Sequence, residues 1–510
     1  MNEERVHTDE PSSLLLIQAL RSHLSLLMIK HRTPGLNIAV ADRGKMIWEA
    51  GFGLADIASS RPMSPDSVYH SGSLGKTYTA VAIMILLDRG PIGLDDPIND
   101  HLPFKVHNPL GQRDITVHDL MVHVSGLGAD AAASHWRPGR SLAEELAAEY
   151  SSEWSPFHGG RLVKRWTHPV GTAWTYSNLG IATLGLIVER ANPDKLSFSE
   201  FVQRYIMDPL GMTHSCYPPA QHPDFVPPHI WAQTTTGYSR MGDVDTPTIP
   251  VYFREYPAGG VLARPADHLR LLLALMNEGE LDGYRLLSPQ SVRSMLSPDA
   301  RLGTLKDSFG DPVSEQGLVW RLLDREFPWT SFGHSGGHMF GWRTEGRAWP
   351  NYGSAVVVAA NQWSLPDHTK EAAEIAEFVG NWLRHRQIEN APAVDPATLS
   401  YVRGALLAGA YRIAIGIPGE MPAGALEAIT RDSRDRGAVL RRSVNAEWDK
   451  AFFSRGFAAV AALPPTLEAI HRFWKSDASE VDLATAHAAY RSLGGRPDAG
   501  LLWKLLPPEL

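Results

Sequence analysis

The sequence is poor in cysteine: its 510 residues contain one, Cys216. A single thiol cannot form an internal disulfide, so no disulfide framework stabilises this chain. The surrounding stretch, HSCYPPAQHPDF, carries no signature of a cysteine enzyme. We therefore interpret Cys216 as a packed or idle thiol.

Long apolar runs are also missing, and no segment approaches the roughly 20 apolar residues of a membrane-spanning helix. The first residues, MNEERVHTDEPSS, are acidic and polar, whereas a secretory signal needs a basic start followed by an apolar run. We therefore expect a cytoplasmic protein without a membrane partner.

The sequence has no excess of positive charge, since 48 Lys and Arg against 56 Asp and Glu give a net charge of −8. Proteins that bind nucleic acid usually carry a basic face or stripe. We expect no nucleic-acid partner.

The order of helical and strand patterns predicts an α/β sandwich, a sheet flanked by helices. Apolar spacing indicates a helix over 12–31, and residues 36–54 read as two strands joined at Asp42, Arg43 and Gly44. Strand patterns return at 317–323, 337–346 and 353–363. A sheet built from both ends of this region, with helices between, explains that order.

The length exceeds one ordinary hydrophobic core, so we expect two domains. The linker-like stretch NAPAVDPAT divides them into a domain of residues 1–390 and a mainly helical accessory domain of residues 391–510. Within the first domain, residues from about 92 to 310 form a mostly helical insertion.

The stretch HSGSLGKTYTAVAIMILLDRG, residues 70–90, contains Ser73 and Lys76 in a helix that ends at Gly90. So apolar a helix is a buried one, and lysine is rarely buried without a reason. Residues i and i+3 share a helix face, so the Lys76 amine lies within reach of the Ser73 hydroxyl. Burial lowers a lysine pKa, so Lys76 can act as a base near neutral pH. The alternative is an N-cap serine with a lysine that reaches solvent.

Two further stretches carry polar residues of similar chemistry. TYSNLG supplies Tyr176, which can relay protons beside a lysine, and Asn178, which can orient a lysine or a substrate amide. FGHSGGHMFGW places residues 334–337 just before a strand, and the N–H of Gly337 could stabilise an oxyanion. Taken alone, either stretch could be a tight turn.

In this order the three motifs resemble those of the serine β-lactamase and penicillin-binding-protein superfamily: S-x-x-K, then Y-x-N, then H-x-G. Tyrosine in the second motif resembles the class C-like branch, which includes family VIII carboxylesterases, D-aminopeptidases and transesterases. LMVHVSGL (120–127) and PAGGVLARPADHLRLL (257–272) are similar to accessory stretches of the family. The resemblance covers roughly residues 12 to 388.

The resemblance implies a role for each motif residue and requires no metal or organic cofactor. Ser73 would be the acylated nucleophile, activated by Lys76 and Tyr176, either of which could be the formal base. Asn178 would hydrogen-bond Lys76 or the substrate. The backbone N–H groups of Ser73 and Gly337 would stabilise the oxyanion. On the strand side, the site would be lined by His334, Ser335 and Gly336.

His118 and His123 form an H-x4-H spacing near the accessory stretch, which differs from the H-E-x-x-H of a zinc helix. We interpret His123 as a structural histidine that follows a helix.

The third motif begins with His334, where penicillin-directed members usually carry lysine. Histidine is largely neutral at pH 7, which weakens recognition of an anionic β-lactam. We therefore predict a carboxylesterase acting on a small neutral ester or amide. Four tryptophans precede the second motif: Trp136, Trp154, Trp166 and Trp174. These side chains could wall an apolar acyl pocket or pack a helical subdomain.

Other activities of the same fold stay open. They are D-amino-acid amide or peptide hydrolysis, β-lactam hydrolysis, and acyl transfer or cyclisation by a thioesterase-like enzyme. A sensor or interaction protein that is acylated without turnover is the non-enzymatic alternative. A homodimer is possible.

Overall fold

The computed structural model describes residues 3–129, 140–157, 161–218, 224–241, 244–248, 254–303, 305, 313, 316–323, 331–338, 341–365 and 371–386. Its chain divides into two compact units. Met1–His7 and Pro34–Ala376 form the first, and Thr8–Thr33 and Glu377–Leu510 form the second. The predicted accessory domain, 391–510, lies outside the described residues, and its boundary stays a prediction.

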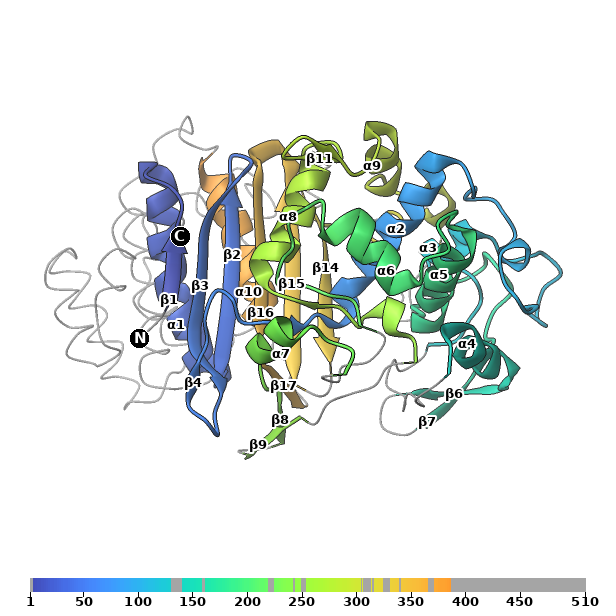
Figure 1. Cartoon of the computed structure of the whole chain (residues 1–510), viewed down its shortest axis with the longest axis horizontal. Coiled ribbons are helices and arrows are strands. Elements are labelled where there is room, and N and C mark those ends of the chain that lie inside the picture. Colours follow the sequence, from blue (N-terminus) through green and yellow to red (C-terminus); the bar gives the residue numbers. More distant parts are fainter. Residues whose placement is uncertain are drawn as a thin grey trace, which may run out of the picture. The chain divides into compact units, whose positions relative to one another are not determined.

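A large antiparallel sheet forms one layer of the first unit (Figure 1). Its strands follow the order β1 (Glu3–Val6), β3 (Lys45–Asp56), β2 (Gly35–Asp42), β16 (Ser354–Ala360), β15 (Trp342–Trp349), β14 (Ser331–His338) and β13 (Arg321–Leu323). A short strand, β4 (Arg61–Pro62), pairs with β3. Because β2 pairs with β16, the predicted sheet built from distant parts of the chain is confirmed.

The predicted hairpin over 36–54 is confirmed as β2 and β3. Its two connecting residues, Arg43 and Gly44, have φ of 50° and 77°. Two successive positive φ values are typical of the tight turn that matches the twist of paired strands.

The predicted strand over 337–346 is wrong, because the chain turns within it, between the end of β14 and the start of β15. Gly341 has a φ of 123° there, and a Cβ on it would lie 2.2 Å from Tyr238 N. The predicted strand over 317–323 shortens to β13. That over 353–363 divides into β16 and β17 (Gln362–Leu365), which pairs in parallel with β8 (Tyr238–Met241).

Helices α2 (Lys76–Arg89), α5 (Asn178–Ala191) and α8 (Pro265–Met276) lie on one side of the sheet (Figure 1). α8 packs on β2, β15 and β16, while α2 packs on α5. Gly90, with a φ of 86°, ends α2 as predicted. The other described helices of this unit are α3 (Val117–Met121), α4 (Leu142–Ser151), α6 (Phe198–Val202), α7 (Pro228–Gln233) and α9 (Pro289–Met295).

Short strands complete this unit. They pair as β5 (Tyr69–His70) with β10 (Leu262–Ala263), β6 (Trp154–Phe157) with β7 (Arg161–Lys164), β8 with β9 (Val244–Pro247), and β11 (Glu280–Leu281) with β12 (Tyr284–Arg285).

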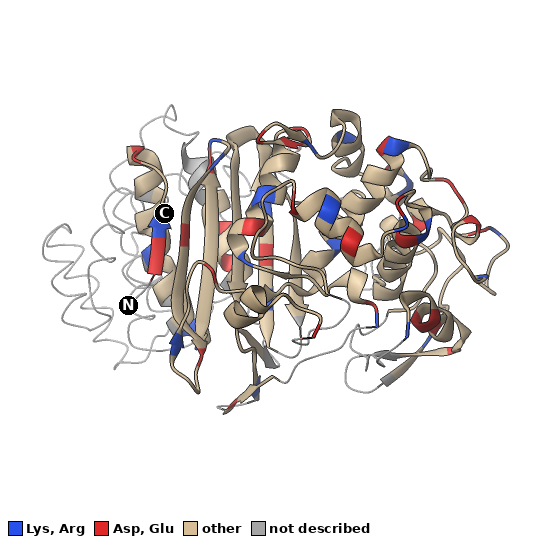
Figure 2. Cartoon of the chain, in the orientation of Figure 1, with Lys and Arg blue, Asp and Glu red and all other residues tan. Residues whose placement is uncertain are grey.

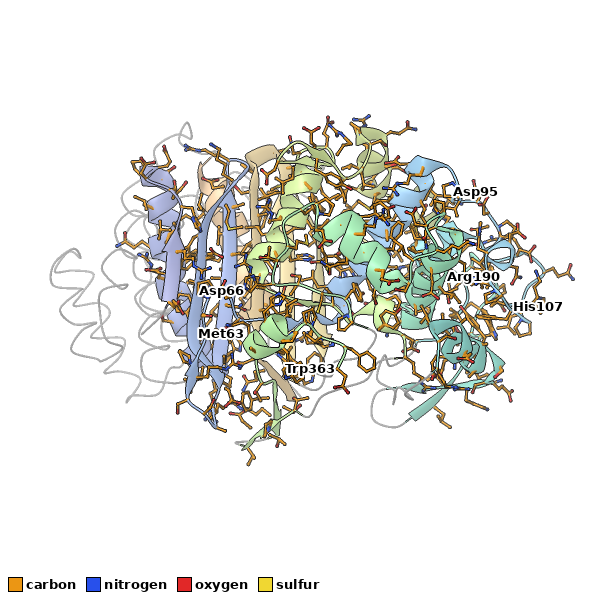
Figure 3. All side chains as sticks on the ribbon, viewed as in Figure 1. Met63, Asp66, Asp95, His107, Arg190 and Trp363 are labelled. Atoms are coloured by element: carbon orange, nitrogen blue, oxygen red, sulfur yellow. The ribbon has the colours of Figure 1, made fainter. Side chains whose placement is uncertain are left out.

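Acidic and basic residues are interspersed along the ribbon of the first unit (Figure 2). Asp66, labelled in Figure 3, accepts hydrogen bonds from Arg5 Nη1 on β1 at 2.9 Å and from Arg264 Nη1 at 2.6 Å. Arg264 is also the N-cap residue of α8, so this pair of contacts ties the edge strand to the start of that helix.

The second unit contains α1 (Pro11–His31), which confirms the helix predicted over 12–31. α10 (Glu371–Arg386) continues into it from the first unit. Within the second unit, the rings of His23 and Phe378 stack with centroids 4.3 Å apart. The described helices include none with the length and apolar character needed to cross a bilayer.

Fold stability should depend on the charge state of His268, a fully buried residue of α8 hydrogen-bonded to Tyr78 Oη on α2 at 3.0 Å. Burial lowers its pKa from 6.5 to about 3. As pH falls below 6.5, the histidine of the unfolded chain binds a proton while the buried His268 of the folded chain does not. The free energy of unfolding therefore decreases between pH 6.5 and pH 3, by about 1.4 kcal/mol per pH unit. We expect thermal unfolding of H268Q to depend less on pH between 7 and 5 than that of the wild type.

The exposed His107 (Figure 3) supplies the control, since H107Q should keep the wild-type pH dependence. Equal slopes for H268Q and the wild type would contradict the prediction.

Candidate active site

Ser73 was predicted to lie in the same helix as Lys76. It lies instead in a 3₁₀ turn, η1 (Gly72–Gly75), immediately before α2. Ser73 is half-buried, whereas Lys76, the first residue of α2, is fully buried. Side chains three residues apart are eclipsed in a 3₁₀ turn, so the predicted approach survives. Lys76 Nζ donates a hydrogen bond to Ser73 Oγ at 3.0 Å.

Lys76 Nζ also donates to Asn178 Oδ1 at 2.6 Å and to the backbone oxygen of Ala258 at 2.7 Å. An ammonium has three N–H donors, and all three are used. Asn178 Oδ1 and the Ala258 oxygen can only accept. A Lys76 amine that had given up one proton would therefore keep those two contacts and direct its lone pair at Ser73.

The Ala258 carbonyl is held in place by a short 3₁₀ segment, η5 (Tyr256–Ala258). The neighbouring Pro257 oxygen accepts hydrogen bonds from Thr79 Oγ1 at 2.6 Å and Tyr217 Oη at 2.7 Å. A Cβ on Gly185 of α5 would lie 2.4 Å from Pro257 Cβ, so this glycine permits the approach. Sequence reasoning missed Ala258, although its stretch PAGG was noted as similar to the family.

Tyr176 lies beside this amine: its ring centroid is 4.9 Å from Lys76 Nζ. The Tyr176 side chain is half-buried, and no described residue is hydrogen-bonded to its hydroxyl. Asn178 is the first residue of α5, and Ser177 caps that helix by accepting from Gly180 N at 3.0 Å. The structure thus brings the predicted Ser73, Lys76, Tyr176 and Asn178 together.

Residues 334–337 lie inside β14, which corrects the prediction that they precede a strand. β13 pairs only with residues 331–333, so the motif extends beyond its end. Gly336 packs tightly on η1: a Cβ on it would lie 1.9 Å from the Ser71 oxygen and 2.9 Å from Leu74 N. Only a glycine allows this approach.

Gly337 and η1 meet at Gly72, which has a φ of 55°. A Cβ on Gly72 would lie 2.8 Å from Gly337 N. The amide of Ser73 follows Gly72 directly, so the two predicted oxyanion donors come from backbone segments in close contact. On the other face, a Cβ on Gly337 would lie 2.4 Å from the ring of Trp363, which is labelled in Figure 3.

His334 is buried, and its Nδ1 lies 2.6 Å from the Ser335 oxygen. Burial, followed by the positive charges of Arg321 and Lys76, holds the pKa of His334 well below 6.5. A neutral His334 is therefore what the site contains at pH 7. Ser335 is half-buried in the same strand, and no described contact joins its side chain to Ser73 or Lys76.

Three of the four predicted tryptophans can be placed, since Trp136 lies outside the described residues. Trp174 is near the site, its ring 6.3 Å from that of Tyr176. Trp166 packs against Tyr150 at 6.2 Å, and Trp154 is 44% exposed. Of these three, only Trp174 has a ring contact with a residue of the predicted motifs.

His118 and His123 serve different partners. His118 Nε2 is hydrogen-bonded to Asp299 Oδ2. The ring of His123 instead lies 4.7 Å from that of Tyr176. Among the residues that the structure describes, no group of three or more His, Cys, Asp or Glu side chains is arranged to hold a metal ion.

Comparison with known proteins agrees with these motifs. The sequence pattern of the Beta-lactamase family matches residues 20–380. Penicillin-binding protein 4 of Amycolatopsis lactamdurans is 28% identical over 320 residues, which are 61% of this chain and 76% of that protein. Protein flp of Staphylococcus aureus is 26% identical over 189 residues, 37% of this chain; the chain thus matches only 36% of the length of that relative.

Solved structures share the fold. The octameric penicillin-binding protein homologue from Pyrococcus abyssi has a TM-score of 0.58 and 21% identity, and the match covers 74% of this chain and 82% of that protein. A class C beta-lactamase has a TM-score of 0.55 and 19% identity, covering 73% and 97%. At this identity the likeness concerns the fold alone.

The close contact between β14 and η1 predicts that G336A removes most of the reactivity of Ser73. The added methyl would push β14 away from η1 and misplace both oxyanion donors, and loss of one such donor costs about 100-fold or more. The measurement is the rate at which a fluorophosphonate probe labels Ser73, followed by intact-protein mass.

G303A is the matched control, because the nearest atom to a Cβ at that exposed site is 3.6 Å away. Similar labelling rates for the two variants would refute the prediction.

Proposed function

The chain belongs to the beta-lactamase family, and we propose that it is a serine hydrolase that forms an acyl-enzyme on Ser73, with neutral carboxylic esters or amides as substrates. The observation that carries this proposal is the set of three hydrogen bonds from Lys76 Nζ to Ser73, Asn178 and Ala258. It joins a half-exposed hydroxyl to an amine with two fixed acceptors.

In the proposed acylation, the Lys76 and Tyr176 pair takes the proton of the Ser73 hydroxyl as Oγ attacks the substrate carbonyl. The N–H groups of Ser73 and Gly337 stabilise the negative charge that develops on the carbonyl oxygen. The tetrahedral intermediate then expels the alcohol or amine, which receives a proton through Tyr176. The hydroxyl of Tyr176 suits this relay because no described residue holds it.

Deacylation would use the same groups in reverse. A water molecule loses a proton to the Tyr176 and Lys76 pair and attacks the acyl carbonyl, and Ser73 Oγ leaves with a proton from that pair. The products are a carboxylic acid and the alcohol or amine, so the sum of the two steps is hydrolysis.

The neutrality of His334 supports an uncharged substrate. Its pKa lies well below 6.5, so the strand side of the site offers no permanent cation at this position. A carboxylate close to His334 would therefore lose the charge pairing that a lysine would give. A neutral acyl group has no such requirement.

The proposal predicts that the wild-type chain hydrolyses p-nitrophenyl esters of C2 to C12 acids faster than nitrocefin or D-alanine p-nitroanilide. S73A should lose this activity, because no other hydroxyl is hydrogen-bonded to Lys76 in the part of the chain that the structure describes. Initial rates across the series would also measure the size of the acyl pocket.

Faster turnover of nitrocefin or of the anilide would replace the esterase proposal with a β-lactamase or amidase. Stable acylation of Ser73 without turnover would instead favour an acyltransferase that lacks its acceptor, or a sensor.

The charge argument is tested separately with H334K. We expect the ratio of nitrocefin to p-nitrophenyl acetate turnover to rise by about tenfold, the effect of one added hydrogen bond to a charged group. The neutral variant H334Q is the matched control and should leave the ratio unchanged. If the two variants shift the ratio equally, charge at this position does not select the substrate.

A further inference from the structure

His123 contacts every residue of the segment that carries Tyr176. Its backbone oxygen accepts a hydrogen bond from Thr175 N at 2.9 Å, and its ring Nδ1 accepts one from Ser177 N at 3.2 Å. Between these two bonds, its ring lies 4.7 Å from the Tyr176 ring with an interplanar angle of 36°. Trp174 packs edge-on against the other part of the ring at 5.7 Å.

The backbone of His123 is held in an unusual conformation, with a φ of 60°. Left-handed backbone is uncommon for a residue other than glycine and costs energy, so it persists where surrounding contacts enforce it. The contacts here run to residues 174–177. The position is the first after the C-cap of α3, a helix whose N-cap is secured by a capping box of Thr116 and Asp119.

The ring must be neutral to make its contact with Ser177. A protonated imidazole has donors on both nitrogens, so it could not accept at Nδ1. Burial, then the charges of Lys76 and Arg321, lowers the pKa of His123 to about 3. The nearby titratable groups are cationic or neutral: Lys76 from α2, Arg321 from β13, and the neutral His334 from β14.

We propose that His123 is a positioning residue for catalysis: its neutral ring fixes residues 174–177 so that Tyr176 stays beside the Lys76 amine with its hydroxyl available. The assignment rests on the proposed role of Tyr176 as a proton relay. Tyr176 has no hydrogen bond of its own among the described residues, so its place depends on its backbone and on ring packing. His123 supplies both.

Two variants separate these contributions. H123N keeps an acceptor near the Nδ1 position, and asparagine tolerates a positive φ. H123F keeps an aromatic ring for Tyr176 but removes the Nδ1 acceptor that the Ser177 N–H uses. Each is made in the wild-type chain and in the Y176F background, which forms a double-mutant cycle.

The readout is the rate of fluorophosphonate labelling of Ser73, because this rate does not depend on which ester or amide is the natural substrate. We expect H123F to label about tenfold more slowly and H123N within about threefold of the wild type, since loss of the buried acceptor is the larger defect. In the Y176F background both substitutions should change the rate by less than about twofold, because their target hydroxyl is gone.

H118N is the matched control, because His118 is equally buried, lies on α3 and pairs with Asp299 away from Tyr176. It should lower the melting temperature and change the labelling rate by the same factor in both backgrounds. Melting curves for all variants show whether slower labelling is only a loss of folded protein.

Slower labelling by H123F of equal size with and without the Tyr176 hydroxyl would overturn the inference, as would equal rates for H123F and the wild type. A wild-type chain that the probe does not label at Ser73 would overturn the proposed function and this assignment with it. A labelled wild type with no coupling between the two positions would overturn the assignment alone.

Discussion

The site depends on one buried amine with three partners. Lys76 is fully buried, and Ser73, Asn178 and Ala258 each accept a hydrogen bond from it. A buried charged or polar group without such partners would cost several kcal/mol, so a lysine at the start of α2 requires the contacts from α5 and η5. The packing of α5 and η5 on α2 and the surroundings of Lys76 therefore depend on the same contacts, and a change that separates α5 or η5 from α2 should affect both.

A second constraint is the need for glycine, which has no side chain, where strand β14 of the sheet contacts η1. Gly72 is in close contact with both Gly337 and Gly259. A Cβ on Gly72 would lie 2.8 Å from Gly337 N, and a Cβ on Gly259 would lie 3.0 Å from the Gly72 oxygen. Gly336 has the same requirement against Ser71. Backbone in direct contact with backbone places N–H groups accurately and without flexible side chains, which is what stabilisation of an oxyanion needs.

Sequence reasoning succeeded where the signal was local. The α1 helix, the β2–β3 hairpin and the pairing of Ser73 with Lys76 follow from apolar periodicity, turn residues and a spacing of three. It missed Ala258 and did not foresee the contacts of His123, because Ala258 accepts through its backbone oxygen and His123 contacts a segment more than 50 residues away. Neither contact leaves a pattern in residue type. The turn between β14 and β15 was missed because Gly341 is its only marker within an apolar run.

Three buried histidines around the candidate site add polar groups without adding charge. Burial lowers the pKa of both His70 and His123 to about 3, and holds that of His334 well below 6.5. His70 Nδ1 accepts from Gly72 N at 3.1 Å, and His123 Nδ1 accepts from Ser177 N at 3.2 Å. One imidazole therefore contacts η1 and the other contacts the segment that carries Tyr176. A lysine or arginine at either position could only donate, and a carboxylate would add a negative charge to the site. A neutral imidazole can accept from a backbone N–H without adding charge, so both backbone segments are held while the charge of the site stays unchanged.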